Sequence, residues 1–407
     1  MKNILIIEPS TSGLNLLPTA KKMGLNTFVL TADKDERIIP QSCQPFIFKK
    51  IIVDTHRLDE MAKIILQIHR DYYLSAIIPG FEIFVSYAAF LSHLIHLPGL
   101  SPEAGKALRN KSIMRTALLE NHVRSVSNVI LQEEHDIKKI AAELKFPVVI
   151  KPIDQSGSMH VSKVNNTNEL LTTYHTLSAD PWTEMGKGIG SVALVEEYVN
   201  GEEFSVEGYV DSGGIHIISV TKKILGEEPF FVEMGHIVPA NLDSDTKENI
   251  AKYVNEVIHA VKLTMGVFHC EIRIDKNGPV LMEIAGRLPG DKICNLILLS
   301  SGIDMWEIMI LSHMGLSVEI NPNPIQQYAG IHFFCLEGKN TFHTVHGVEN
   351  VQALPGFQEF TLIKQPGEFI PPAINFLGRI AYCIFTAPTY KALEKRLDQA
   401  TTMIKFS

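Results

Sequence analysis

Short apolar runs alternate with helical patterns in the first part of the chain. Residues 4–7 are continuously apolar, and a polar stretch at 10–13 separates them from a segment in which apolar side chains recur every three or four positions. The pattern predicts one helix and four buried strands: residues 16–23 for the helix, and 4–7, 27–30, 51–53 and 76–80 for the strands. Strands that alternate with helices indicate a parallel sheet with crossover helices.

After about residue 105 the pattern changes to alternating strands and longer helices. Residues 110–121 predict a helix, because apolar side chains recur there at helical spacing. Residues 211–214, Asp-Ser-Gly-Gly, suit a hairpin turn. A second long helix and six strands are expected: the helix at 247–265, and the strands at 147–151, 192–199, 203–210, 214–221, 267–275 and 279–285. We expect this part to be mixed and largely antiparallel.

Pro322 and Pro324 mark a further change, followed by strand-like runs at 331–334 and 379–385 and a final helix from Tyr390. The fold class predicted from these patterns combines an α/β lobe with α+β lobes. The first lobe resembles nucleotide-binding folds, but it has neither Gly-x-Gly-x-x-Gly nor Gly-x-x-x-x-Gly-Lys-Ser/Thr. A dehydrogenase or a P-loop enzyme is therefore disfavoured.

Composition and charge narrow the class of protein. The chain has 407 residues, 45% hydrophobic and 20% charged, which suits a globular protein of two or three domains. The net charge of −8 gives no basic footprint for nucleic acid, and Lys49-Lys50 and Lys222-Lys223 are interpreted as solvated faces. Five scattered cysteines indicate neither disulfides nor zinc. Because no apolar stretch suits a signal peptide or a membrane span, we expect a cytoplasmic protein without a membrane partner.

Residues 267–285 predict a hairpin with acidic side chains on one face. Period two separates the apolar residues of its first strand from His269, Glu271 and Arg273, and places Leu281 and Glu283 on one face of its second strand. A three-residue loop at 276–278 would pair Asp275 with Pro279. The same register pairs Glu271 directly with Glu283, with Cβ atoms about 5 Å apart.

Two carboxylates opposed in this way repel each other unless a cation lies between them. Their hard oxygen ligands suit Mg²⁺, which combines a few carboxylates with phosphate oxygens. The alternative is that one glutamate is exposed to solvent and the other forms a salt bridge with Arg273 or Arg287.

Three further segments suit the binding of a nucleotide. Lys151 ends an apolar strand and precedes a Ser156-Gly157-Ser158 loop, whose backbone N–H groups can surround phosphates. Residues 195–206 read as a strand, a bend at Asn200-Gly201 and a second strand, which is the layout of a hinge between lobes. The alternatives are a plain turn for the loop, a surface hairpin with exposed acids for the hinge, and a surface lysine for Lys111.

These segments together resemble ATP-grasp enzymes over roughly residues 1–320, in the order Lys111, Lys151-Pro152, the serine–glycine loop, Glu196-Glu197-Tyr198-Val199 with Glu203, and Glu271 with Glu283. The resemblance implies that Lys111 and Lys151 contact the phosphates of ATP and that the loop at 154–159 closes over them. It implies that the hinge backbone, at Glu196, Glu197, Tyr198 and Val199, binds adenine. It assigns the ribose to Glu203 and magnesium to Glu271 and Glu283.

The resemblance also names the expected regions of the chain. They are an N-terminal Rossmann-like domain, a linker helix with a lid subdomain, a C-terminal catalytic subdomain with a mixed sheet, and an α/β extension, at residues 1–105, 106–200, 201–320 and 321–407.

Two stretches resemble the substrate side of L-amino-acid ligases in particular: residues 231–240, with Glu233 and His236, and residues 283–291, with Arg287. The resemblance places His236 near the amino acid and Arg287 at the transferred phosphate or the substrate carboxylate. Packing against the sheet is the alternative for His236. Many relatives carry Asn where this chain has Ala285, so a metal ligand is missing or replaced. His269 is expected either to orient Glu271 or to fill a core position.

The resemblance therefore implies a ligase that joins a carboxylate, an L-amino acid, to an amine through an acyl phosphate. ATP and one or two Mg²⁺ ions, replaceable by Mn²⁺, are its expected cofactors, its partners are small molecules, and a homodimer is left open. Two alternatives remain: a ligase that acylates a carrier protein or a natural-product amine, and a nucleotide-binding regulator without turnover.

Overall fold

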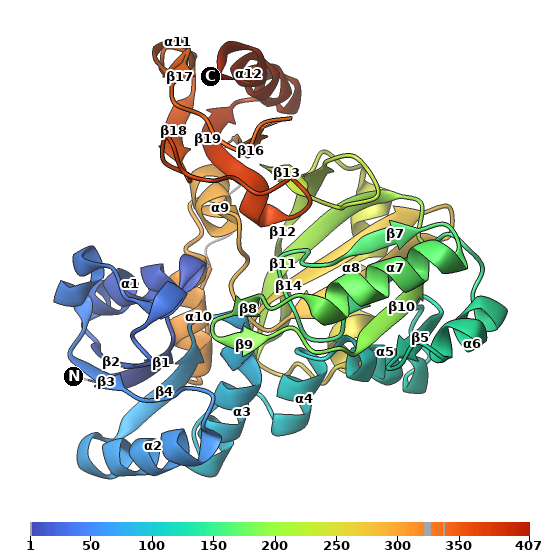
Figure 1. The fold of residues 1–407 in the computed structure, drawn as a ribbon. Helices are drawn as coiled ribbons and strands as arrows, with labels where there is room; N and C mark the ends of the chain where they lie inside the picture. Colours follow the sequence, from blue (N-terminus) through green and yellow to red (C-terminus); the bar gives the residue numbers. More distant parts are fainter. Residues whose placement is uncertain (1, 321–326, 337) are drawn as a thin grey trace.

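The structure is a computed structural model that describes residues 2–320, 327–336 and 338–407. Pro322 and Pro324 lie outside the described residues. Figure 1 shows an N-terminal lobe in blue, a green and yellow central body and a red C-terminal part. The combination of α/β and α+β lobes that the sequence predicts is confirmed.

The N-terminal lobe is built on a parallel sheet of four strands in the order β3-β2-β1-β4: β1 (Asn3–Ile7), β2 (Asn26–Thr31), β3 (Lys49–Ile52) and β4 (Leu74–Pro79). Ile4 and Ile6 point into one core cluster, and Leu5 and Ile7 into another. Both faces are therefore covered, and a strand buried on both faces needs a continuous apolar run. The helices of this lobe are α1 (Leu16–Lys22), α2 (Leu58–Tyr72), α3 (Val85–Leu94) and α4 (Pro102–Ala107).

The prediction that all four of these strands are buried is wrong for residues 51–53. Strand β3 is at the edge of the sheet, and Ile52 is 63% exposed. An edge strand has a neighbour on one side only, so its apolar residues are less protected than those of β1.

The second body begins with α5 (Lys111–Glu120), whose N-terminus is capped by the Asn110 side chain. An antiparallel sheet follows, in the order β5-β10-β6-β7. Its strands are β5 (Asn128–Leu131), β6 (Val148–Pro152), β7 (Ser162–Val164) and β10 (Ala193–Glu197), and its helices are α6 (Asp136–Glu143) and α7 (Thr167–Ala179). A short hairpin of β8 (Thr183–Glu184) and β9 (Lys187–Gly188) extends from this body.

A large antiparallel sheet of eight strands forms the centre, in the order β15-β14-β11-β12-β13-β16-β19-β18. Its strands are β11 (Glu202–Asp211), β12 (Gly214–Leu225), β13 (Glu233–Val238), β14 (Gly266–Asp275), β15 (Gly278–Ala285), β16 (Tyr328–Cys335), β18 (Phe357–Leu362) and β19 (Arg379–Ala387). The pairing of β13 with β16 joins the strands of residues 202–285 to those of residues 328–387 in one sheet. The domain boundaries derived from the sequence stay predictions.

Helices from the second half of the chain pack against this sheet. They are α8 (Ser244–Ala260), α9 (Ile293–Ser301), α10 (Met305–His313), α11 (Val348–Gln352) and α12 (Tyr390–Met403), and a small pair of strands joins β17 (Val345–His346) to β20 (Lys405–Phe406). Helix α8 begins and ends earlier than the predicted 247–265. No single described helix has the length and apolarity to cross a membrane; α9 and α10 pass that test only as a pair, bent by 107°.

The acidic hairpin of β14 and β15 has the predicted pairing but not the predicted loop. Asp275 pairs with Gly278, so the loop is one residue shorter than expected, and a bulge beside Glu271 restores the offset. Glu271 therefore pairs with Glu283, as predicted. The shared face of Leu281 and Glu283 was predicted wrongly, because the bulge lets Leu281 pack in the core opposite Ile272.

Gly201, in the loop between β10 and β11, lies against the backbone of β14. A Cβ atom there would be 2.2 Å from the carbonyl oxygen of Ile274. We expect Gly201→Ala to lower the apparent free energy of unfolding by about 1–3 kcal/mol, measured by urea denaturation, because the loop must move away from β14. Gly190→Ala is the matched control, since its new Cβ would have no neighbour nearer than 4.0 Å. Equal losses in both variants would contradict this explanation.

Candidate active site

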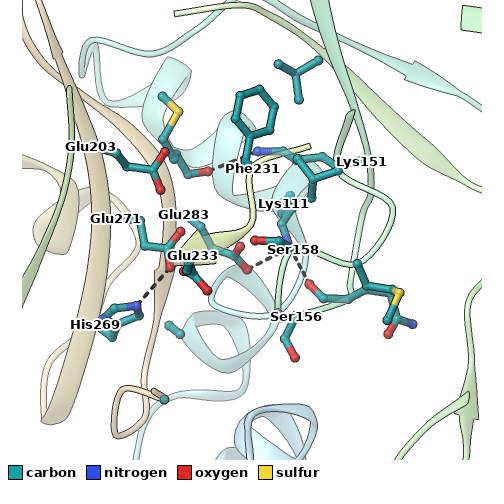
Figure 2. A pocket seen from close by; sticks show the side chains of 18 of the residues that line it. Lys111, Lys151, Ser156, Ser158, Glu203, Phe231, Glu233, His269, Glu271 and Glu283 are labelled. Carbon is teal, nitrogen blue, oxygen red and sulfur yellow. Dashed lines mark hydrogen bonds and ion pairs between the residues drawn. The ribbon is translucent and has the colours of Figure 1, made fainter. Parts of the chain in front are cut away.

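The sequence-predicted site residues meet in one pocket between the β5-β10-β6-β7 sheet and the central sheet. Figure 2 shows Glu233, Glu271 and Glu283 grouped together, with Lys111 beside Glu283. All but one of the predicted residues line this pocket: Lys111, Lys151, Ser156, Gly157, Ser158, Glu196, Glu197, Val199, Glu203, Glu233, His236, His269, Glu271, Glu283 and Arg287.

Tyr198 is the exception, because its side chain turns away from the pocket. Its hydroxyl donates to Glu228 at 2.5 Å, and its ring stacks on Phe231. Lys163 lies over the same ring at 4.2 Å. A contribution of this residue to ligand binding would therefore come from its backbone.

Two buried lysines lie at the end of the pocket where α5 and β6 meet. Lys111 Nζ lies 2.8 Å from Glu283 and donates to the Gln155 carbonyl at 2.7 Å. Lys151 Nζ lies 2.6 Å from Glu196. Lys111 is 5% exposed, so its interpretation as an ordinary surface lysine is wrong.

The side chain of Glu196 is fixed within the protein. Burial raises its pKa, but Arg115 and then Lys151 lower it to about 2. Arg115 Nε donates to it at 2.7 Å from inside α5. Glu196 is 3% exposed, so the alternative of a surface hairpin with four exposed acids is wrong for this residue.

The loop after β6 crosses the pocket with an unusual backbone. Gly157 and Ser158 both have positive φ angles, 64° and 57°. A Cβ on Gly157 would lie 2.9 Å from the Phe376 ring, so both conformation and space favour glycine there. Ser156 turns its hydroxyl toward Glu184 on the β8–β9 hairpin and donates a hydrogen bond to it.

Glu271 and Glu283 face the pocket from neighbouring strands, and cations already contact both. Lys223 Nζ and His269 Nε2 lie 2.9 and 3.0 Å from Glu271. Burial raises the pKa of Glu271, but Lys223 and His269 hold it well below its ordinary range. Among the residues that the structure describes, neither carboxylate pairs with an arginine, so the alternative of a salt bridge to Arg273 or Arg287 is wrong.

The arginines in question have other carboxylate partners. Arg273 Nε donates to Glu203 at 2.9 Å, and Arg287 pairs with the buried Glu82.

His269 holds Glu271 in place. Its Nδ1 lies 2.9 Å from Glu207, and its Nε2 lies 3.0 Å from Glu271. Burial lowers the pKa of His269, but the hydrogen bonds to these two acids raise it to about 9. The imidazolium therefore donates from both nitrogens, which fixes the rotamer of Glu271.

The donor set suits a magnesium ion that takes its other ligands from a substrate. Two opposed carboxylates are available, and Ala285 contributes none. No group of three metal-ligating side chains occurs in the part of the chain that the structure describes. Mg²⁺ is commonly bound by one or two carboxylates together with phosphate oxygens and water.

Lys223 is a site residue that the sequence interpretation missed. Its Nζ contacts Glu203, Glu233 and Glu271 at 3.1, 2.7 and 2.9 Å. Burial lowers its pKa, but Glu233, Glu271 and Glu203 raise it well above its ordinary value. The reading of Lys222-Lys223 as a solvated face is therefore wrong for Lys223. The alternation of side chains along β12 could have revealed this. Adjacent strand residues point to opposite faces, so Lys222 and Lys223 cannot both lie on one solvated face.

A second chain of charges connects the acidic residues Glu233 and Asp291. Arg379 contacts Glu233 and Asp291 at 3.1 and 2.8 Å, and His236 Nε2 lies 3.1 Å from the same Asp291. His236 is 1% exposed, which agrees with packing against the sheet, and it also lines the pocket; its contact with the amino acid stays a prediction. Arg379, Asp291 and Glu82 were also missed as site residues.

A second cavity adjoins the first where the N-terminal lobe meets the central sheet. The two share seven lining residues: Glu82, Ser156, Gly157, Glu233, Arg287, Gly290 and Asp291. Thr11–Gly13 and Pro79–Phe81 line the second cavity from the N-terminal lobe, and Glu184 lines it from the hairpin. Arg287 and the serine–glycine loop thus lie at the junction of two adjoining spaces.

The fold is that of the ATP-grasp enzymes, and the chain is similar to the carboxylate–amine ligases among them. Residues 144–295 match the ATP-grasp domain, which confirms the resemblance found in the sequence. Residues 332–407 match L-amino acid ligase C-terminal domain 2. The chain therefore combines an ATP-grasp domain with the C-terminal domain 2 of the L-amino acid ligases.

Individual relatives agree with this assignment at low identity. The L-arginine-specific L-amino acid ligase of Bacillus subtilis is 24% identical, over 85% of this chain and 86% of that protein. The crystal structure of an L-amino acid ligase from Bacillus licheniformis has a TM-score of 0.86 at 21% identity, and covers 100% of this chain and 98% of that one. The Bacillus licheniformis enzyme shares its fold with this protein.

A neighbour with bound nucleotide has the same fold. The biotin carboxylase domain of Hydrogenobacter thermophilus 2-oxoglutarate carboxylase, solved with MgADP and bicarbonate, has a TM-score of 0.72 at 15% identity over 99% of this chain and 90% of that one. ADP and magnesium are thus ligands of that fold neighbour.

Lys223 should contribute far more to stability than the adjacent Lys222. Lys223→Met leaves three carboxylates without their shared cation, and we expect it to lower the apparent free energy of unfolding by about 3–5 kcal/mol. Lys222→Met is the matched control. It removes a peripheral pair with Glu202 and a cation–π contact with Phe204, each worth about 0–1 kcal/mol. Guanidinium titrations of both variants at neutral pH make the comparison, and similar losses would contradict the central role of Lys223.

Proposed function

We propose that the protein is an ATP-dependent ligase that joins the carboxylate of an L-amino acid to an amine through an acyl phosphate, with release of ADP and phosphate. The observation that carries this proposal is that one pocket contains two lysines, a glycine loop and two opposed glutamates, and opens at Arg287 onto a second cavity. The first pocket suits a nucleoside triphosphate, and the second cavity suits small substrates.

The proposed nucleotide site uses each side of the pocket for a different part of ATP. Lys111 and Lys151 contact the phosphates, and the backbone N–H groups of the 154–159 loop close over them. The backbone of residues 196–199 takes the adenine, and Glu203 takes the ribose hydroxyls. This division is supported by Glu196, whose carboxylate is already paired and leaves backbone groups to recognise the base.

The proposed metal site is the pair of Glu271 and Glu283. One Mg²⁺ ion, or two, or Mn²⁺ in its place, would neutralise charge on the phosphates. Lys223 contacts Glu271, and Lys111 contacts Glu283. Lys111 lies between Glu283 and the loop after β6, so it can pass from the carboxylate to a phosphate oxygen without leaving the pocket.

In the proposed reaction, an oxygen of the acid substrate attacks the γ-phosphorus of ATP, and ADP leaves. Arg287 holds positive charge at the junction of the cavities, where the transferred phosphoryl group and the acid must meet. An amine then attacks the acyl carbon, and phosphate leaves. Closure of the 154–159 loop and its lobe excludes water, which would otherwise hydrolyse the acyl phosphate.

The choice of an L-amino acid as the acid substrate rests on two supports. The C-terminal segment matches a domain of L-amino acid ligases, and a relative similar over most of the chain is named as such a ligase. Glu233, His236 and Arg287 lie on the substrate side, where charged groups can recognise the ammonium and carboxylate of an amino acid.

The proposal is tested with ATP, Mg²⁺, hydroxylamine and each proteinogenic L-amino acid in turn. Hydroxylamine traps acyl phosphates as hydroxamates, so we expect ADP and hydroxamate to form together with at least one amino acid. Binding of ATP with no ADP released for any acid would instead support the regulator alternative.

Glu283→Gln should reduce this turnover at least about 100-fold, because the variant loses one of two anionic metal ligands. Its fold should persist, since Gln is isosteric and can still accept a hydrogen bond from Lys111. Glu256→Gln, on the exposed face of α8, is the control. Turnover is followed as ADP release at several Mg²⁺ concentrations. Unchanged turnover in Glu283→Gln would remove the metal assignment.

A further inference from the structure

The β8–β9 hairpin reaches from the body that carries the glycine loop to the N-terminal lobe. Figure 1 shows it extending toward the blue and teal elements. Met185 at its tip is buried in the core of the N-terminal lobe, and its carbonyl lies 2.8 Å from His56 Nε2. Lys187 on its second strand pairs with Asp154, at the start of the glycine loop. The hairpin is thus anchored at its tip and on its second strand, and it contributes Glu184 to the lining of the second cavity.

Glu184, on the first strand of this hairpin, has one carboxylate oxygen without a partner. The residue is 6% exposed and lines the second cavity together with Arg287. Its Oε1 accepts a hydrogen bond from Ser156 Oγ. Its Oε2 is buried and has no hydrogen-bond donor among the described residues. A buried acceptor left unpaired costs about 1–3 kcal/mol, more when charged, so this position favours a ligand that brings a donor.

The other acids of this cavity differ from Glu184, because each is matched by a cation. Glu82 pairs with Arg109 and Arg287, and Asp291 pairs with Arg379. Glu233 pairs with Lys223 and Arg379. Lys187, the cation on the same hairpin, contacts Asp154 instead of Glu184. Glu184 is therefore the acid of this cavity whose charge has no salt-bridge partner within the described residues.

We propose that Glu184 binds the ammonium group of the amine substrate in the second cavity and removes its proton, as the general base of the amide-forming step. This inference rests on the proposed ligase function. An ammonium group offers Oε2 both a hydrogen-bond donor and a positive charge. Ser156, which holds Oε1, belongs to the loop proposed to close over the phosphates, so the same loop positions the acyl phosphate and the base.

The surroundings of Glu184 suit proton transfer. Burial is the largest effect on this carboxyl group and raises its pKa, and the nearby Glu82 raises it further. The Ser156 hydroxyl, Arg109 and Arg287 lower it. The net result is a raised pKa. A carboxylate with a raised pKa is a stronger base, and positioned bases typically contribute about 10²–10⁴-fold in rate.

The step balances as follows. The ammonium group gives one proton to Glu184 and becomes a neutral amine. The amine nitrogen forms a bond to the acyl carbon, and the carbon–oxygen bond to the phosphate breaks, with its electron pair staying on the phosphate oxygen. The second proton lost from nitrogen goes to phosphate, which leaves as hydrogen phosphate. Glu184 then returns its proton to water.

Hydroxylamine separates this role from a structural one, because it is uncharged at neutral pH and needs no base. Wild type, Glu184→Gln and Glu143→Gln are compared with ATP, Mg²⁺ and proteinogenic L-amino acids, with hydroxylamine in one series and a second amino acid as the amine in the other. Hydroxamate and dipeptide are measured separately. We expect Glu184→Gln to keep wild-type hydroxamate formation and to lose dipeptide formation at least about 100-fold. Glu143→Gln, an exposed change on α6, should retain both.

Each other outcome overturns a stated claim. Equal losses of hydroxamate and dipeptide in Glu184→Gln would mean that the residue only supports the fold or the glycine loop, and undisturbed dipeptide formation would remove it from the reaction. The wild-type protein distinguishes these results from a failure of the proposed function. If it forms neither hydroxamate nor dipeptide with any amino acid, the ligase proposal itself is overturned.

Discussion

Crowding of negative charge is the constraint on which the pocket depends. Glu203, Glu233 and Glu271 contact one ammonium group, that of Lys223, within 3.1 Å. Without it, three carboxylates would share a space that water hardly reaches, and their mutual repulsion would oppose folding. Strands β11, β12, β13 and β14 are adjacent in the sheet, so Lys223 on β12 reaches acids on its neighbours and on the strand beyond. The order of the strands therefore determines whether this charge balance can form.

The same constraint connects the separate bodies of the molecule. Lys111 from α5 contacts Glu283 on β15, and Arg287 after β15 contacts Glu82 of the N-terminal lobe. Each pair connects two bodies of the molecule, and its residues line the first pocket. In the proposed reaction the phosphates and the metal exchange partners with these groups, so binding rearranges charges that are already balanced. Such an exchange avoids the free energy of bringing a new charge into a buried site.

Much of this arrangement could be predicted from local patterns. Period two placed His269 and Glu271 on the pocket face of β14, and hydrophobic periodicity located α5 and most strands within a few residues. The pairing of Glu271 with Glu283 was also correct, although the loop was one residue too long and the bulge was missing, because these two errors cancel. A bulge depends on how Leu281 packs against Ile272, and a single strand's pattern does not contain that information.

The residues that the sequence did not reveal come from segments far apart in the chain. Glu82 and Glu184 have no motif around them, and they become site residues only because the N-terminal lobe and the hairpin enclose the cavity beside Arg287. Ser156 illustrates the consequence. The sequence identified it as part of a flexible loop, whereas the structure fixes its hydroxyl on Glu184 and so ties the loop to the far wall of the cavity. If the loop moves over a nucleotide and keeps the hydrogen bond from Ser156 to Glu184, the Glu184 carboxylate must move with it. If the loop breaks this hydrogen bond, the carboxylate becomes free to bind a substrate.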